Sequence, residues 1–215
     1  MKSLSPYLKT TYFLDADHPA IIQYTKEKTE EALTPTEKVV ALYYAIRDGF
    51  WYNPSKVSLK KEDLKASQLL TKEAGYCVEK SNLLATCARV LGIPSRLSFS
   101  NVTNHLGTAK LEKILKTNIL VFHGCAELYL DDKWIKATPV FNKELCEKLG
   151  VAPLPFNGKE DAIFQAYDRS GNKYMEYLHD YGHFADLPFA LMVQEWKKYY
   201  GHLIEDETDM LVFNI

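Results

Sequence analysis

The sequence has no apolar run long enough to cross a bilayer, and its N-terminal stretch MKSLSPYLKTTYFLDADH lacks the apolar core of a signal peptide. It also lacks a CxxC pair: Cys77, Cys87, Cys125 and Cys146 are scattered along the chain. These absences argue against a membrane span, an export signal and a disulfide framework. We therefore expect reduced thiols and a cytoplasmic protein.

The sequence also lacks an excess of positive or negative charge. Lys and Arg number 26 against 28 Asp and Glu, which gives a net charge of −2 and a pI near 6.3. This balance does not favour nucleic acid or an anionic membrane as a partner. The chain also has no repeat, low-complexity tract or Gly/Ser linker. We predict one domain over residues 1–215, with N-terminal helices in 1–50, a core over about 51–142 and a mixed extension over 143–215.

The strongest secondary-structure signals are helix ends. In TPTEKVVALYYAIRDG, Thr34 and Glu37 form a capping box and Gly49 ends the apolar periodicity. A second amphipathic helix begins near Cys77 and ends at Gly92. Strand patterns fill the middle of the chain and helical patterns return near its end. This order predicts an α+β fold.

The clearest hairpin is NILVFHGCAELYL-DD-KWIKATPVF, with Asp131 and Asp132 in its turn. If Leu130 faces Lys133, His123 lies on the mixed face of the hairpin, diagonal to Thr138. The opposite face is apolar and should face the core. It carries Phe122, Ala126, Leu128, Leu130, Ile135 and Ala137.

Cys77 stands at the head of its predicted helix, directly after Gly75 and Tyr76. A helix N-terminus carries unpaired N–H groups and a partial positive charge, which favour a thiolate and can stabilise an oxyanion beside it. A histidine on a facing strand, such as His123, is suited to act as a general base and later to protonate the leaving group. The spacing of Cys77 and His123 in the sequence does not by itself show that they act together.

Three stretches, in order, resemble the core of the transglutaminase-like superfamily, which is related to papain-like cysteine peptidases. They are ASQLLTKEAGYC, LLATCARVLGIPSR and HGCAELYLDDKWIKATPV. The resemblance covers residues 64–141 and implies a papain-like or transglutaminase-like core, in which the helix that carries the cysteine packs on an antiparallel sheet. It also implies that Cys77 is the nucleophile and His123 its proton carrier.

Two positions depart from the family pattern. The tryptophan that commonly lies two residues after the histidine is replaced by Cys125, and the aspartate that orients the histidine aligns with Thr138. A threonine hydroxyl can accept the imidazole N–H bond, but it brings no charge to stabilise an imidazolium. We predict Thr138 as the orienting residue and keep Asn142 in reserve, because papain-like peptidases use an asparagine in that role.

The rest of the site is less sharply defined by the sequence. An oxyanion donor should precede Cys77, and three residues qualify as candidates: Trp51, Tyr52 and Gln68. Four further residues are candidates for the lining of the cleft: Gly75, Tyr76, Cys125 and His183.

We expect cysteine-dependent acyl transfer on the amide bonds of a peptide or protein, most simply hydrolysis through a thioester acyl-enzyme. The chemistry needs no cofactor. One alternative is a cross-linking transglutaminase, in which an amine replaces water. Another is a peptide-binding or protein-binding module of the same fold that is weak or inactive as a catalyst. The sequence does not predict the oligomeric state.

A metal-dependent hydrolase is a further rival. His179 and His183 are four residues apart, with Asp180 and Asp186 nearby, which would suit a divalent metal if the segment were helical. Gly182 between the two histidines weakens that helix. We therefore predict no metal site.

Overall fold

The computed structural model describes residues 3–104, 109–164, 167, 169–172, 175–205 and 210–212. The helices are η1 Ser5–Tyr7, α1 Pro19–Lys28, α2 Pro35–Gly49, η2 Lys61–Leu64, α3 Ala66–Leu69, α4 Cys77–Val90, α5 Ala109–Leu115, α6 Lys143–Lys148, α7 Phe189–Tyr200 and η3 Gly201–Leu203. The strands are β1 Trp51–Tyr52, β2 Lys56–Ser58, β3 Ala74–Gly75, β4 Ser95–Asn104, β5 Ile119–Leu130, β6 Lys133–Ala137, β7 Met175–Phe184, β8 Ile204–Glu205 and β9 Met210–Val212.

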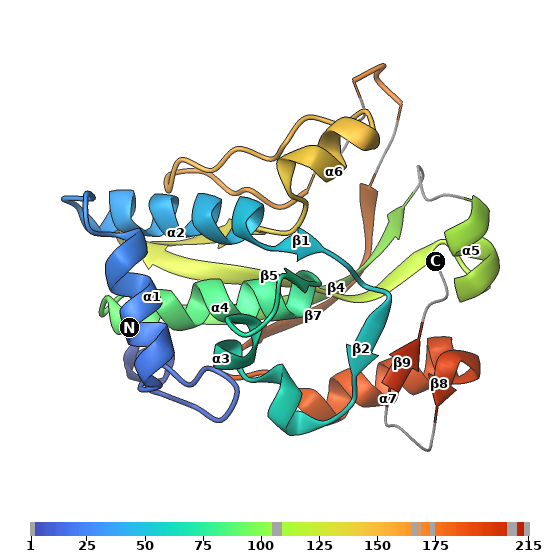
Figure 1. Cartoon of the computed structure of the whole chain (residues 1–215), viewed down its shortest axis with the longest axis horizontal. Coiled ribbons are helices and arrows are strands. Elements are labelled where there is room, and N and C mark those ends of the chain that lie inside the picture. The colour runs from blue at the N-terminus through green and yellow to red at the C-terminus, as the bar shows by residue number, and fades with distance from the viewer. Residues whose placement is uncertain are drawn as a thin grey trace.

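An antiparallel sheet in the order β6-β5-β4-β7 forms the centre of the molecule. Two small sheets accompany it: the parallel pair β1-β3 and the antiparallel set β2-β9-β8. Helix α4 runs alongside β5, and α2 and α3 pack against α4 in turn (Figure 1). The predicted α+β fold, with the cysteine-bearing helix packed on an antiparallel sheet, is confirmed.

The helix ends follow the sequence signals. Oγ1 of Thr34 accepts a hydrogen bond from the Glu37 amide at 3.2 Å, and Oε2 of Glu37 accepts one from the Thr34 amide at 2.8 Å. After α4, Gly92 takes a φ of 72°, a left-handed conformation that glycine adopts without steric cost. Both predicted caps are confirmed.

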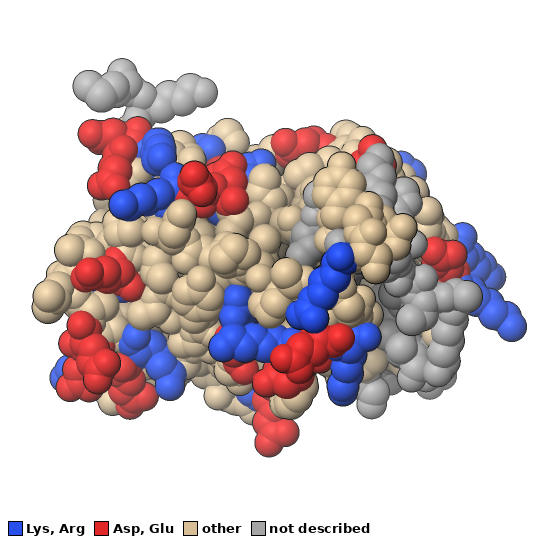
Figure 2. All heavy atoms as spheres, turned by 90° about the horizontal axis from the view of Figure 1, so that it is seen from above, with Lys and Arg blue, Asp and Glu red and all other residues tan. Residues whose placement is uncertain are grey.

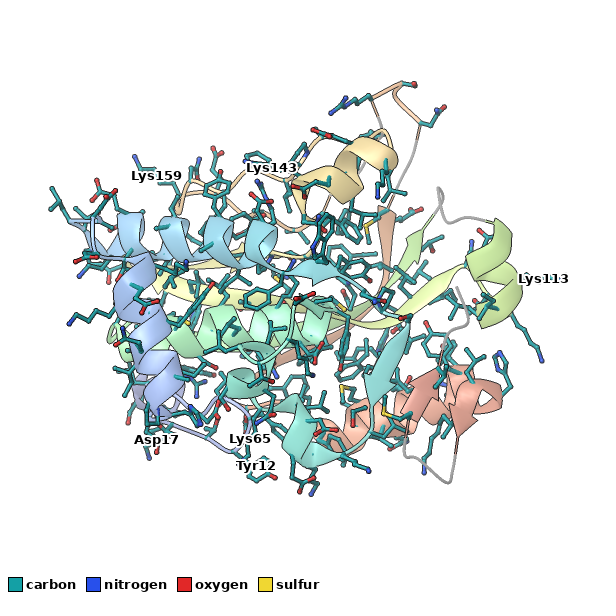
Figure 3. The ribbon with its side chains drawn as sticks, viewed as in Figure 1. Tyr12, Asp17, Lys65, Lys113, Lys143 and Lys159 are labelled. Atoms are coloured by element: carbon teal, nitrogen blue, oxygen red, sulfur yellow. The ribbon has the colours of Figure 1, made fainter. Side chains whose placement is uncertain are left out.

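The N-terminal segment before α1 is tied to α3. The Ala66 amide donates to the Phe13 carbonyl at 2.8 Å. Farther out, the Lys65 ammonium lies 4.7 Å from the ring centroid of Tyr12, and both residues are labelled in Figure 3. This segment therefore braces the elements that lead to Cys77.

The β5–β6 hairpin has the predicted register, with Leu130 opposite Lys133 and Ala126 opposite Ala137. Asp131 and Asp132 both have positive φ, as a tight two-residue turn requires. The expected mixed face differs from the prediction in one respect. Four of its residues, His123, Cys125, Glu127 and Thr138, are buried, and His123 is only 4% exposed.

Strand β5 is interrupted just before His123. Ser100 of β4 pairs with His123, but Val102 pairs with Leu120, so β5 contains an extra residue between these pairs. Phe122 lies in this bulge with a φ of 63°. Bulges of this kind bend a strand and re-aim the side chains that follow. The simple alternation along the hairpin did not predict it.

The segment 175–184 is the edge strand β7 rather than a helix or loop. The helical arrangement that a metal site on His179 and His183 would need is therefore contradicted. On the face seen in Figure 2, basic and acidic side chains are interspersed. In the part of the chain that the structure describes, no helix combines the length and the apolar character that a bilayer crossing requires.

Candidate active site

Cys77 is the first residue of α4, and the chain approaches it through the short strand β3. Oε2 of Glu79 accepts a hydrogen bond from the Tyr76 amide at 3.1 Å and so fixes the helix entrance. A side chain at Gly75 would bring a Cβ within 2.6 Å of Cδ1 of Leu69. Gly75 therefore packs closely against the Leu69 side chain of α3.

Gly124, the residue after His123, meets the start of α4. Strand β6 ends at Ala137, opposite Ala126, so Gly124 has no partner in β6. A Cβ on Gly124 would lie 3.1 Å from Cα of Val78 and 3.4 Å from the carbonyl oxygen of Cys77. Helix and strand thus touch backbone to backbone beside Cys77.

The electrostatics of Cys77 combine two opposing effects. Burial raises the pKa of its thiol to about 11, although the amides of Gly124, Val78 and Cys77 itself lower it. By surface area the side chain is only partly buried, whereas the other three cysteines are buried. At neutral pH the sulfur is therefore a thiol, close to amides that favour its anion.

His123 lies beside the same apolar cluster that Cys77 packs against. Val140, Phe141 and Met175 belong to this cluster and also line a cavity of about 10 Å³ at the His123 ring. Burial lowers the pKa of His123 to about 4. The structure thus brings Cys77 and His123 to one region, with both groups uncharged at neutral pH.

The sequence relates this chain to a known family. The sequence model of the transglutaminase-like superfamily matches residues 22–139, more than half of the chain. The chain belongs to the transglutaminase-like superfamily.

One solved structure agrees at the level of the fold. A putative cysteine protease from Cytophaga hutchinsonii aligns with a TM-score of 0.51 and 17% identity, over 86% of this chain and 55% of that one. A putative protease from Parabacteroides distasonis aligns with a TM-score of 0.40 and 17% identity, over 63% of this chain and 25% of that one. The present chain thus spans about half the length of the first. No curated protein matches it.

Thr138, the residue expected to orient His123, lines the same cavity as His123. Within the described part of the chain, neither Nε2 of His123 nor Oγ1 of Thr138 has a hydrogen-bond partner. Thr138 is fixed by its backbone instead, because its amide donates to the Ala162 carbonyl at 2.9 Å. The predicted hydrogen bond that would orient the ring is not formed in this structure.

Asn142, the reserve candidate, is engaged elsewhere. Its Oδ1 accepts a hydrogen bond from the Tyr52 amide at 3.1 Å, and its Nδ2 donates to Oε2 of Glu144 at 2.7 Å. Asn142 therefore joins the start of α6 to β1 and does not orient His123.

The three oxyanion candidates occupy different places. Tyr52 pairs with Gly75 and Trp51 pairs with Ala74, so both lie next to the strand that leads to Cys77. Trp51 is 53% exposed, and the Tyr52 amide is already used by Asn142. Gln68 lies on α3, where its backbone amide donates to the Lys65 carbonyl. The backbone amide of Trp51 is also used, because it donates to the Glu73 carbonyl at 3.0 Å. Trp51 and Tyr52 lie next to the approach to Cys77, but their backbone amides are not free to stabilise an oxyanion.

The residues expected to line the cleft differ in their exposure to solvent. Tyr76 and Cys125 are buried, at 4% and 5% exposure, so neither offers appreciable surface to a ligand. His183 is exposed, but it lies on the edge strand β7. The described residues contain no group of three or more His, Cys, Asp and Glu side chains that could hold a metal ion.

Lys80 is an important residue that the sequence reading missed. It is fully buried one turn after Cys77, and its Nζ donates to the carbonyls of Arg47, Phe50 and Val140 at 2.9, 2.9 and 2.7 Å. Burial lowers its pKa to about 7, yet three acceptors match the three donors of an ammonium group. Lys80 ties α4 to the end of α2 and to the chain after β6. Its only sequence signal was a lysine on an otherwise buried helix.

Proposed function

We propose that this chain catalyses cysteine-dependent acyl transfer on amide bonds, with water as the acceptor and a peptide or protein as the substrate. The observation that carries the proposal is the position of Cys77 at the start of α4, where the helix meets Gly124 of β5 backbone to backbone. Gly124 directly follows His123, so the strand that meets the helix at Cys77 also carries the candidate base.

The charge states suggest the order of events. At neutral pH both Cys77 and His123 are uncharged, so the thiol proton passes to the imidazole as the sulfur attacks the carbonyl carbon. The amides at the start of α4 stabilise the oxyanion. The imidazolium then protonates the departing amine, which leaves a thioester on Cys77. Attack by water on the thioester, with its proton taken by His123, releases the acid and restores the thiol.

A non-catalytic binding module is the second candidate, and one observation favours it. Thr138 brings no charge to the His123 ring, whose Nε2 has no partner among the described residues. Such a site retains the fold but lacks the charge that would stabilise an imidazolium. A cross-linking transglutaminase would use the same acyl-enzyme with an amine as acceptor.

Cleavage of a complex peptide library in water enriched in oxygen-18 tests these possibilities. The wild-type protein should generate new carboxyl ends that contain the heavy isotope, and Cys77→Ala should generate none. If the two proteins give identical digests, the hydrolase proposal fails, and retention of peptides on immobilised wild-type protein would then support the binding module. New amide products that form only with an added primary amine would identify a transglutaminase.

A further inference from the structure

The backbone just before His123 lacks regular strand partners. The bulge at Phe122 breaks the β4–β5 register, and β6 has already ended at Ala137. Phe122 has a φ of 63°, which is strained for a bulky side chain and costs on the order of 1–3 kcal/mol. Something must therefore hold this part of the strand in place.

Side chains replace the missing backbone partners. Oδ1 of Asn101 accepts a hydrogen bond from the Phe122 amide at 3.0 Å. The Tyr200 hydroxyl accepts one from the Val121 amide at 2.8 Å and donates to the Ile119 carbonyl at 2.7 Å. Asn101 is 4% exposed, so its bond is made away from bulk water.

Trp196 adds another bond from the same helix as Tyr200. Its Nε1 donates to the Val121 carbonyl at 3.2 Å, and both aromatic side chains are 4% exposed. Both residues belong to α7, beyond residue 139, where the family match ends. Helix α7 therefore holds a part of β5 that the matched core leaves open.

The same contacts bring α7 close to Cys77. Burial raises the pKa of the Tyr200 hydroxyl, although its bond with the Val121 amide lowers it. The ring of Trp196 is 6.1 Å from that of Tyr76, the residue before Cys77. One helix thus contacts the approaches to both Cys77 and His123.

We propose that Trp196 and Tyr200 are positioning residues, which clamp the bulged backbone of residues 119–122 and thereby aim His123 toward Cys77. This inference rests on the proposed function in one respect, namely that His123 serves as the base for Cys77. The clamp itself concerns the geometry of the ring and can be observed without turnover.

Tyr200→Phe removes both hydroxyl bonds and keeps the ring, and Trp196→Phe removes the indole donor. Tyr44→Phe is a matched control, because the Tyr44 hydroxyl likewise donates to the Phe156 carbonyl at 3.2 Å and accepts from its amide at 3.1 Å, on a different part of the chain. NMR of histidine labelled with carbon-13 would follow the His123 ring, assigned by its loss in His123→Gln. Labelling of Cys77 by iodoacetamide would be timed in parallel.

We expect Tyr200→Phe and Trp196→Phe each to shift the His123 resonance and its titration midpoint, and to slow Cys77 labelling by roughly tenfold. Tyr44→Phe should alter neither, even if it lowers the melting temperature equally. If both α7 variants fold and leave the His123 resonance unchanged, the clamp is wrong. If Tyr200→Phe does not fold, the His123 resonance in Trp196→Phe alone tests the clamp. If the ring shifts but Cys77 reacts as fast in His123→Ala as in wild type, the clamp stands and the proposed function fails.

Discussion

His123 and Thr138 line one cavity of about 10 Å³, and neither Nε2 of His123 nor Oγ1 of Thr138 has a hydrogen-bond partner among the described residues. A space of this size has room for at most one water molecule. Thr138 therefore brings no charge that would stabilise the protonated ring, and burial lowers the pKa of His123 to about 4. This relationship distinguishes the site from one with an aspartate at position 138.

Replacement of Thr138 by aspartate should restore that charge. A carboxylate beside the ring raises the pKa of His123, and the imidazolium then lowers the pKa of Cys77. We expect Thr138→Asp to increase the rate of Cys77 labelling at pH 7 by roughly tenfold or more, since one pKa unit corresponds to a tenfold change in thiolate.

Thr138→Ser is the matched control, because it keeps a hydroxyl and adds no charge. It should label at the wild-type rate. Thr138→Asp with an unchanged rate, in a protein that retains its circular dichroism spectrum, would mean that Thr138 does not face the functional side of the ring.

Protonation of His123 should destabilise the fold in a defined pH window. The folded state lowers the pKa from 6.5 to about 4, so the unfolded chain binds more protons between these values and stability falls as the pH drops from 6.5 to 4. The loss should reach about 3 kcal/mol. Urea unfolding of wild type and His123→Gln across this range measures it, and equal slopes for the two proteins would contradict the burial of the ring.

Lys80 should contribute to stability through its three carbonyl partners. Lys80→Met leaves the carbonyls of Arg47, Phe50 and Val140 buried without a donor. We expect a loss of about 3 kcal/mol or more in the free energy of unfolding. Lys143→Met is the control, since Lys143 is 60% exposed and lies 3.6 Å from Asp48, a pair that contributes less than about 1 kcal/mol. Similar losses in both variants would show that Lys80 has no special structural role.

A side chain at Gly124 should lower the stability of the protein. The added Cβ of Gly124→Ala would press on Cα of Val78 and push the start of α4 away from β5. Denaturant titration should show a loss of about 1–3 kcal/mol, and Cys77 labelling should slow. Gly49→Ala is the control, because its new Cβ would meet nothing within 4 Å. It should change neither the stability nor the rate of Cys77 labelling. Normal stability and labelling in Gly124→Ala would refute the tight backbone contact at this point.

The sequence was sufficient where local rules decide the structure. The Thr34 capping box, the left-handed Gly92 and the Asp131-Asp132 turn each depend on a few neighbouring residues, and all three were predicted correctly. The position of Cys77 at the head of a helix follows from the same kind of signal. The order of the elements then gave the α+β class.

Features that depend on distant partners could not be predicted in this way. The bulge at Phe122 is held by Asn101 and by side chains of α7, and no periodicity in the hairpin reveals it. The engagement of Asn142 could not be predicted either, because its Oδ1 accepts a hydrogen bond from the Tyr52 amide of β1, a distant part of the chain. Strand β7 was missed because its glycine and mixed polarity resemble a loop, while its pairing with β4 decides its structure.

Iodoacetamide labelling of the four thiols, resolved by mass spectrometry from pH 6 to 10, is the most direct test of the partnership between Cys77 and His123. In wild type, Cys77 should react faster than the three buried cysteines, and His123→Ala should slow Cys77 by roughly tenfold or more while leaving its exposure to solvent intact. Equal rates for Cys77 in wild type and His123→Ala, in proteins of matched fold, would show that the imidazole does not serve the sulfur.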